Sequence, residues 1–515
     1  MSYPIVQKNH GRFYLYEAES HWDPEKKRPY QTRTYIGTCD ENGRLIAKAT
    51  RQRTVSVSKT FGPYYLMLEI AGRCGLYDRL SEVFGEERAD ILTALAVSRT
   101  VHAEPMCGLE DGMEESFLPE LLGIDWEFTS SQLTRFMQDL GRSEEAIYGF
   151  FRASAEPGET VIFDITSFST SSEELDLAEY GRKYRTTKLP QVNMGMAASV
   201  KTGLPFFYKL YPGGVSDMAA VRNLVADLKD LGSDGIHIVA DRGFFSESNL
   251  SRILEAKFGF SLPVPSGNNI FKYSVSEAVR PPEDPLNADI MGDSAVRCFE
   301  TAAEICGAKI RTLVFQDDGR RHSEIKTLYS KIAAFELSVS QKKWNPGKIC
   351  DLTDPEKELL SMFDIAEGKD GKASAVRKRN AVSARENRCG RFVILTTSEE
   401  RWQDVLFMQR RRNDIEQNFA DFKTELEGGV KYLSGGDSVQ GMIFAEFVSL
   451  ILRTELLRIM RETELLKKMR VPDVFRIMRK LKITRIGEEW RLNEVTKKQK
   501  DLFGALGVKP PQDSY

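Results

Sequence analysis

The sequence predicts an α/β protein whose core is a mixed sheet. Short apolar strands alternate with helical segments between residues 160 and 264, and a further apolar strand at 391–396 precedes two long helical segments. The chain has 515 residues, of which 41% are hydrophobic. A chain of this size is expected to form roughly two to four domains with a sizeable core.

Two regions precede the predicted core. Residues 1–60 are predicted to be an N-terminal β-hairpin region, because 33–49 contains strand-like stretches on both sides of the turn Glu41-Asn42-Gly43. Residues 61–152 have helical periodicity and are predicted to be a helical DNA-binding region. Two closely spaced helices, one after Thr129 and one after Ser143, could form a helix-turn-helix DNA reader. An ordinary helical hairpin is the simpler alternative.

The predicted core comprises residues 153–265 and 391–450, and an insertion domain at 266–390 interrupts it. A C-terminal helical region at 451–515 follows. Alternating apolar patterns place strands in the core at 160–163, 192–200, 205–211, 236–240 and 258–264, and helices at 217–231 and 246–257. The insertion is more polar, with a strand-like segment at 308–315 and a helix at 354–363.

The formal net charge of −3 conceals strong local differences. Residues 103–127 carry eight acidic groups and no Lys or Arg, whereas 366–391 carry eight basic groups against three acidic ones, and 453–500 carry fifteen against seven. Clustered Lys and Arg side chains are what phosphate neutralisation requires, although solvated helix faces produce similar blocks. Within the first basic block, Arg377, Lys378 and Arg379 are candidates for DNA contacts.

The composition disfavours several classes of protein. No run of about 18 apolar residues occurs, so no membrane span is expected. The N-terminus lacks the apolar region of a signal peptide. The seven cysteines are scattered without a C-x-x-C, and the five histidines lack ligand spacing, so we expect reduced thiols and neither a disulfide framework nor a zinc site. No phosphate-binding glycine motif points to a nucleotide-dependent enzyme.

Three carboxylates stand at positions suited to chemistry on phosphates. Asp164 and Asp241 each follow an apolar strand, at the sheet edge where α/β folds place their sites. Glu416 shares one predicted helix face with Arg412 and Lys423. Three carboxylates are what a two-metal phosphoryl-transfer site needs, and Mg²⁺ prefers carboxylate and water oxygens. A plain surface ion pair is the alternative for Glu416.

These segments resemble a known family, the DDE-type insertion-sequence transposases with an RNase H-like catalytic domain. Within it, the sequence is similar to the subgroup with a Tyr-Arg-Glu-Lys signature and a β-rich insertion before the catalytic Glu. The resemblance covers residues 155–510 and rests on three motifs, at 162–167, 238–244 and 412–423. Gln409 stands where the family has the Tyr of the signature.

The resemblance implies an RNase H-like mixed-sheet catalytic core and assigns roles to individual residues. Asp164, Asp241 and Glu416 would be the catalytic triad that binds two Mg²⁺ ions, for which Mn²⁺ can substitute. Arg412 and Lys423 would contact DNA phosphates near the cut. In relatives, a Trp of the insertion holds an unpaired base, which makes Trp344 a candidate, although a packed surface Trp is the simpler interpretation.

The implied activity is DNA transposition. The enzyme would bind the terminal inverted repeats of an insertion sequence, cleave the 3′ ends and join them to target DNA, as a homodimer in a synaptic complex. It would act in the prokaryotic cytoplasm, associated with the nucleoid and not with a membrane. Two alternatives remain: an RNase H-like nuclease without strand transfer, and a domesticated or inactive transposase that serves as a DNA-binding protein.

Overall fold

The computed structural model divides the chain into two compact units, Met1–Val57 with Arg485–Glu489, and Ser58–Thr484 with Trp490–Tyr515. The residues that it describes are 2–9, 11–46, 57–102, 108–169, 177–180, 189–215, 217–232, 235–278, 287–340, 354–367, 373–424 and 435–512.

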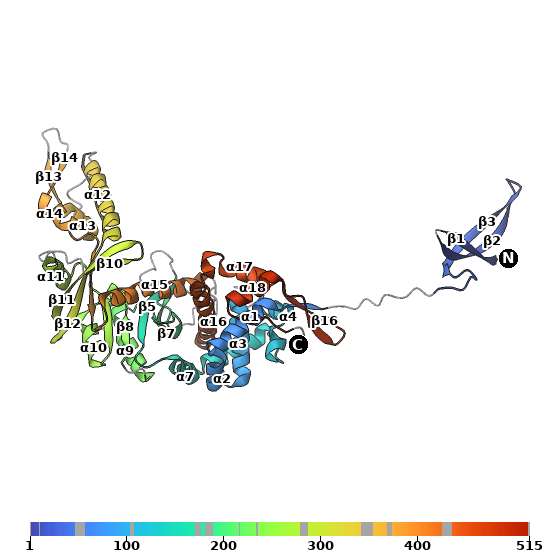
Figure 1. The fold of residues 1–515 in the computed structure, drawn as a ribbon, viewed down its shortest axis with the longest axis horizontal. Coiled ribbons are helices and arrows are strands. Elements are labelled where there is room, and N and C mark those ends of the chain that lie inside the picture. The colour runs from blue at the N-terminus through green and yellow to red at the C-terminus, as the bar shows by residue number, and fades with distance from the viewer. Residues whose placement is uncertain are drawn as a thin grey trace. The chain divides into compact units, whose positions relative to one another are not determined.

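The first unit contains a three-stranded antiparallel sheet in the order β1-β2-β3 (Figure 1), formed by β1 (Ser2–Asn9), β2 (Arg12–Asp23) and β3 (Arg28–Cys39). The sheet therefore differs from the hairpin predicted at 33–49, because the first half of that segment belongs to β3, which pairs with β2. Among the described residues, the turn at Glu41-Asn42-Gly43 closes a single bridge, between Cys39 and Leu45. Among the described residues of these strands only Ala18 and Cys39 are buried, so this sheet has almost no core of its own.

The second unit is built on a nine-stranded mixed sheet in the order β10-β11-β12-β15-β9-β8-β5-β6-β7. Its central strands β5, β8 and β9 are parallel, and β5, β6 and β7 are antiparallel. This arrangement confirms the predicted α/β class with an RNase H-like mixed-sheet core. The bounds of these five strands are β5 Thr160–Ser169, β6 Gln191–Ser199, β7 Pro205–Pro212, β8 His237–Val239 and β9 Gly259–Pro263.

Strands from the insertion continue the same sheet. β15 (Arg391–Thr396) pairs antiparallel with β9 on one side and with β12 (Ala308–Asp317) on the other, and β11 (Ser294–Ile305) and β10 (Ala288–Met291) complete the edge. The rest of the insertion packs around a small second core that includes Leu328, Ile332 and Phe363. Its elements are α12 Asp318–Ser340, α13 Asp354–Ser361, β13 Phe363–Glu367, β14 Ala373–Arg377 and α14 Arg379–Glu386.

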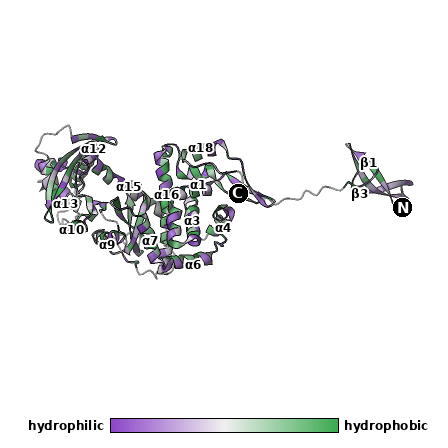
Figure 2. Ribbon diagram, turned by 60° about the horizontal axis from the view of Figure 1, so that its bottom comes forward, coloured by the Kyte–Doolittle hydropathy of each residue, from purple (hydrophilic) through white to green (hydrophobic). Residues whose placement is uncertain are grey.

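Helices cover the sheet and form a bundle beside it. The long helix α16 (Gly436–Glu462) packs against β7 and against α3 and α6, and Figure 2 shows hydrophobic residues along α3 and α16. The remaining elements are β4 Ser58–Thr60, α1 Gly62–Arg73, α2 Leu76–Phe84, α3 Glu86–Val101, α4 Leu109–Glu115, α5 Leu118–Leu122, α6 Ser130–Gly141, α7 Glu144–Ser154, α9 Asp217–Asp230, η2 Arg242–Phe244, α10 Glu247–Glu255, α11 Asn269–Glu277, α15 Trp402–Thr424, η6 Leu465–Lys467, α17 Val471–Met478, β16 Lys482–Ile486, β17 Glu489–Leu492 and α18 Lys497–Ala505.

The two helices considered as a DNA reader pack against different elements: α6 packs against α16, and α7 packs against α2 and β7. A Cβ atom on Gly441 of α16 would lie 2.0 Å from the carbonyl oxygen of Met137 in α6, so glycine allows the two helices to touch. On α7, Phe150 is buried with its ring 5.4 Å from that of Phe444. Both helices bury apolar side chains in the bundle, and DNA binding by residues 61–152 stays a prediction.

Two further observations concern the classes excluded above. No helix in the described part of the chain is long and apolar enough to cross a membrane. The cysteines at 39, 74, 298, 306 and 389 are all free thiols.

Candidate active site

Asp164 and Asp241 lie on neighbouring parallel strands. Ile162 of β5 pairs with Val239 of β8, so each Asp stands two residues beyond this pair, in the same register and on the same face of the sheet. The strand β5 continues to Ser169, so Asp164 lies within the strand and not at its end as the sequence analysis expected. Asp241 lies two residues beyond the last residue of β8 and accepts a hydrogen bond from the backbone N–H of Arg242 at 2.7 Å.

The carboxyl group of Asp164 has an unusual environment. Burial raises its pKa to about 6, while the backbone N–H of Ile165, 2.8 Å away, and the charge of Arg412 act in the opposite direction. The charges of Asp241 and Glu416 raise the pKa further. The charges of Asp241 and Glu416 therefore act on Asp164, and the catalytic triad stays a prediction.

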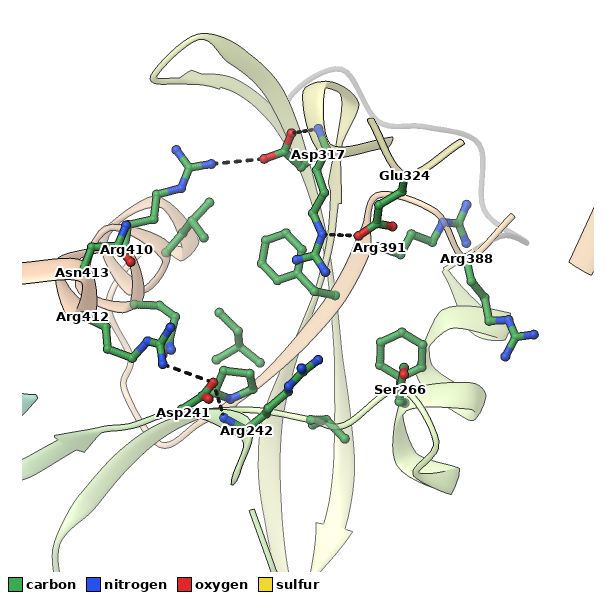
Figure 3. Close-up of a pocket in the computed structure, with 18 of the residues that line it drawn as sticks. Asp241, Arg242, Ser266, Asp317, Glu324, Arg388, Arg391, Arg410, Arg412 and Asn413 are labelled. Atoms are coloured by element: carbon green, nitrogen blue, oxygen red, sulfur yellow. Dashed lines mark hydrogen bonds and ion pairs between the residues drawn. The ribbon is translucent and has the colours of Figure 1, made fainter. Parts of the chain in front are cut away.

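Arg412 connects two of these carboxylates. Its Nη1 lies 3.4 Å from Oδ1 of Asp241, and its Nη2 lies 2.8 Å from Oε1 of Glu416, one turn further along α15. Helix α15 packs on β5, which places both side chains over the sheet edge. Figure 3 shows Arg412 directed from α15 toward Asp241.

Gln409, at the position of the expected Tyr, also anchors α15 to this edge. Its Nε2 donates a hydrogen bond of 3.2 Å to the carbonyl oxygen of Ala240, the residue before Asp241. Its Oε1 is buried without a hydrogen-bond partner in the described part of the structure. Gln409 therefore helps to fix the backbone that carries Asp241.

A cavity of about 620 Å³ opens beside Asp241, between the sheet, α15 and the insertion. Several of its side chains are ion-paired, such as Arg410 with Asp317 at 3.3 Å (Figure 3). Arg320 likewise pairs with Glu324 at 2.7 Å. Four carboxylates line the cavity against seven arginines, so its charge is positive. The arginines are Arg242, Arg320, Arg385, Arg388, Arg391, Arg410 and Arg412.

The sequence analysis did not identify most of these arginines as site residues. Arg385, Arg388 and Arg391 belong to the basic block at 366–391, and that block was the signal for them. Arg242 directly follows Asp241, and no charge pattern marked it. The cavity draws these groups together from segments that lie far apart in the sequence.

The other predicted DNA-binding residues lie elsewhere or outside the described residues. Arg377 forms an ion pair with Glu336 at 2.6 Å, and Lys378 forms one with Asp364 at 3.2 Å, both within the insertion. Arg379 begins α14. Trp344 lies outside the described residues, and Lys423 lies in α15 but its side chain is outside the description. The roles predicted for all five stay predictions.

The chemistry of the triad fits a divalent cation. Carboxylate oxygens are the ligands that Mg²⁺ prefers, and Asp164, Asp241 and Glu416 supply ligands of this kind. Among the described residues, no three His, Cys, Asp or Glu side chains are arranged closely enough to hold a metal ion. In this arrangement the guanidinium of Arg412 serves as the counter-ion of Asp241 and Glu416.

Residues 156–452 match the family model described as the transposase DDE domain. This range is more than half of the chain, and the chain therefore belongs to this family. It is a transposase, an enzyme that cleaves DNA and transfers strands, as the resemblance predicted. Enzymes of this family generally use divalent metal ions.

Among solved structures, the chain is similar to a piggyBac transposase in a synaptic complex with hairpin DNA. The sequence identity is 9% and the TM-score is 0.36, over 77% of this chain and 70% of that chain. No curated protein matches the chain.

Proposed function

We propose that the chain is the transposase of an insertion sequence. It binds the terminal inverted repeats, cleaves the 3′ ends and joins them to target DNA. Two ends must be brought together, so it acts as a homodimer in a synaptic complex, on the chromosome in the cytoplasm of a prokaryote. The observation that supports this proposal is the contact of Arg412 with both Asp241 and Glu416, whose charges also act on Asp164, beside a cavity rich in arginine.

Each group has a role in two successive phosphoryl transfers. Asp164, Asp241 and Glu416 would hold two Mg²⁺ ions, for which Mn²⁺ could substitute. When bound, the ions activate the attacking oxygen and stabilise the leaving oxygen. Arg412 and the cavity arginines bind the phosphates that flank the cut, since a guanidinium pairs with phosphate through two hydrogen bonds. Lys423, on the same helix as Arg412, is proposed as a further phosphate contact.

Each of the two steps forms one P–O bond and breaks one P–O bond. In the first, a water oxygen forms a bond to phosphorus at the transposon end, the bond to the 3′ oxygen breaks, and a 3′ hydroxyl is released. In the second, this 3′ hydroxyl forms a bond to a target phosphorus, and a target 3′ oxygen leaves. The second step makes and breaks one phosphodiester bond, so it needs no external energy source.

The test compares carboxylate variants on a labelled duplex that ends in the inverted repeat bordering this gene. Asp164→Asn, Asp241→Asn and Glu416→Gln should each lower Mg²⁺-dependent cleavage by at least about 10³-fold while retaining duplex binding. Asp404→Asn is the matched control, because Asp404 lies on the same helix α15 but pairs with Arg401 at 3.0 Å, away from the triad. Normal cleavage by any triad variant would remove that residue from the assignment.

The same reactions separate the two alternatives. Adding a supercoiled target plasmid tests strand transfer, and cleavage without joined products would identify an RNase H-like nuclease. Binding without cleavage by the wild-type chain, in Mg²⁺ and in Mn²⁺, would identify a domesticated DNA-binding protein. Sedimentation with and without the end duplex tests the homodimer.

A further inference from the structure

One face of the N-terminal sheet is unusually rich in aromatic, amide and guanidinium groups. Alternate residues of a strand point to one face, and the strand register shows which residues share it. Tyr16 of β2 stands between Ile5 of β1 and Tyr35 of β3, and the next even-numbered residue, Ala18, stands between Tyr3 and Arg33. We call this surface the aromatic face; it carries Tyr3, Ile5, Gln7, Tyr14, Tyr16, Ala18, Trp22, Gln31, Arg33 and Tyr35.

The large side chains of the aromatic face are open to solvent. Trp22 is 64% exposed and Tyr35 is 53% exposed, and the Tyr35 ring contacts that of Tyr16 at a centroid distance of 5.6 Å. The two aliphatic members, Ile5 and Ala18, are partly or fully buried. The exposed part is therefore formed by groups that combine a flat ring or plane with polar atoms.

Polar side chains of β1 and β3 on the aromatic face contact one another across β2. Arg33 of β3 reaches Oε1 of Gln7 on β1 and Oε1 of Gln31, each at 3.4 Å. The Nε2 of Gln31 donates to the hydroxyl of Tyr3. These contacts preorganise one guanidinium and two amides at the centre of an exposed surface.

The acidic residues of this sheet all lie on one of its two faces. The acidic residues of the strands are Glu17, Glu19 and Asp23, which occupy odd-numbered positions of β2 and so lie on the opposite face. The aromatic face has no carboxylate. In the sequence, residues 47–56 that follow the sheet contain Lys48, Arg51 and Arg53 and no acidic residue. On charge, a phosphate-bearing partner is favoured on the aromatic face over the opposite face.

We propose that the aromatic face reads base edges of the terminal repeats in double-stranded DNA, an inference that rests on the proposed function. Gln can pair with adenine and Arg with guanine through two hydrogen bonds each, and tyrosine hydroxyls can contact phosphates. Sheets placed in a DNA groove are a known mode of readout. Gln7, Gln31 and Arg33 are the base-reading residues in this proposal.

On α7, the second of the two helices considered as a DNA reader, the exposed surface lacks the combination of aromatic, amide and guanidinium groups that the aromatic face carries. The apolar side chains of α7, including Phe150 and Phe151, are buried in the bundle. Its exposed first turn carries Glu144 and Glu145, which repel phosphates. The aromatic face has the opposite combination of exposure and charge.

The experiment selects bound duplexes from a random-sequence library with the full chain, in EDTA so that no DNA is cleaved. The wild-type chain should enrich a sequence motif. The double variant Gln31→Ala/Arg33→Ala should lose this motif and bind the selected duplex about 10- to 100-fold more weakly, with less than threefold change on unrelated duplex. Arg28→Ala is the matched control, since Arg28 is an exposed arginine of β3 whose partner Asp23 places it on the opposite face.

The outcomes of this selection test base reading by the aromatic face separately from the proposed binding of inverted repeats. Retention of the motif by the double variant, or equal loss in Arg28→Ala, would overturn the inference and leave the proposed function standing. Failure of the wild-type chain to enrich any motif would contradict the proposed binding of inverted repeats as well. Gln7→Ala alone, on a different strand, should weaken the motif at one base position, which a misfolded sheet would not do. Photocrosslinks from the selected duplex should map to β1 or β3, and crosslinks confined to α6 or α7 would overturn the inference.

Discussion

Replacing Arg412 by Met should increase the affinity of the active site for divalent cations, although it should also reduce DNA cleavage. The guanidinium lies 3.4 Å from Asp241 and 2.8 Å from Glu416, so a cation that binds these carboxylates must compete with it. Met keeps an unbranched apolar stem and removes the charge. Cleavage should fall because Arg412 is also the proposed phosphate contact.

The size of the effect follows from the exposure of the two ion pairs. The pair with Glu416 is an i,i+4 pair in which the carboxylate is 49% exposed, and such pairs contribute about 0.3–0.5 kcal/mol. The pair with Asp241 joins two elements, and its Arg is 20% exposed, so about 1 kcal/mol is a reasonable value. A cation that no longer competes with both pairs gains about 1.5 kcal/mol, which corresponds to roughly tenfold in affinity.

Calorimetric titration of the DNA-free chain with Mn²⁺ or Mg²⁺ measures this affinity directly. Arg410→Met is the matched control, because Arg410 lies on the same helix and in the same cavity but contacts Asp317 and the carbonyl oxygen of Met291. It should leave the cation affinity unchanged. If Arg412→Met binds the cation no more tightly than the wild-type chain, Arg412 does not compete for the triad and the reasoning is wrong.

Two further predictions concern stability. Gly441→Ala should destabilise the fold by about 3 kcal/mol or more, because the new Cβ would lie 2.0 Å from the carbonyl oxygen of Met137. Gly436→Ala is the control, because a Cβ at this position of the same helix meets open space. Equal melting temperatures for the two variants would contradict this packing. Burial lowers the pKa of His237, whose ring is 2.8 Å from the Ser261 hydroxyl, to about 4. As the pH falls, the His237 side chain is therefore protonated in the unfolded chain at a higher pH than in the folded chain. The stability that the neutral, buried His237 contributes above pH 6.5 should be lost as the pH falls to about 4, by at most about 3 kcal/mol. Urea unfolding across this range should show a shallower pH dependence in His237→Gln, and an unchanged slope would refute the assignment.

The parts of the fold that the sequence predicted are those in which the local pattern determines the structure. β5, β6 and β9 are short runs buried on both faces, and their apolar composition is visible without knowledge of their partners. β11 was missed because polar residues such as Glu300 and Thr301 interrupt its apolar pattern, and it is a strand because it pairs with β12 along its length. That pairing joins the insertion to the core sheet, and no local pattern in the sequence shows it.

In the site as well, local patterns predicted individual residues but not the contacts between segments far apart in the sequence. Asp164 and Asp241 could be selected because both follow apolar segments, and Glu416 because helical spacing groups it with Arg412. The ion pair between Arg412 and Asp241 depends on how α15 lies over β8, which spacing along one helix cannot give. The arginines of the cavity meet only because β15 brings the end of the insertion next to the catalytic edge.

A net charge of −3 is compatible with action on DNA because the basic groups are concentrated where phosphates are expected. Non-specific affinity for DNA grows with the number of phosphates that a protein neutralises. In this chain the cavity has three more arginines than carboxylates, and the aromatic face has an arginine and no carboxylate, whereas acidic groups occupy the opposite face of the same sheet. Contacts with phosphates carry no sequence information, so the selection of the transposon ends must depend on contacts with bases. The aromatic face, with two amides and a guanidinium fixed at its centre, supplies groups of that kind.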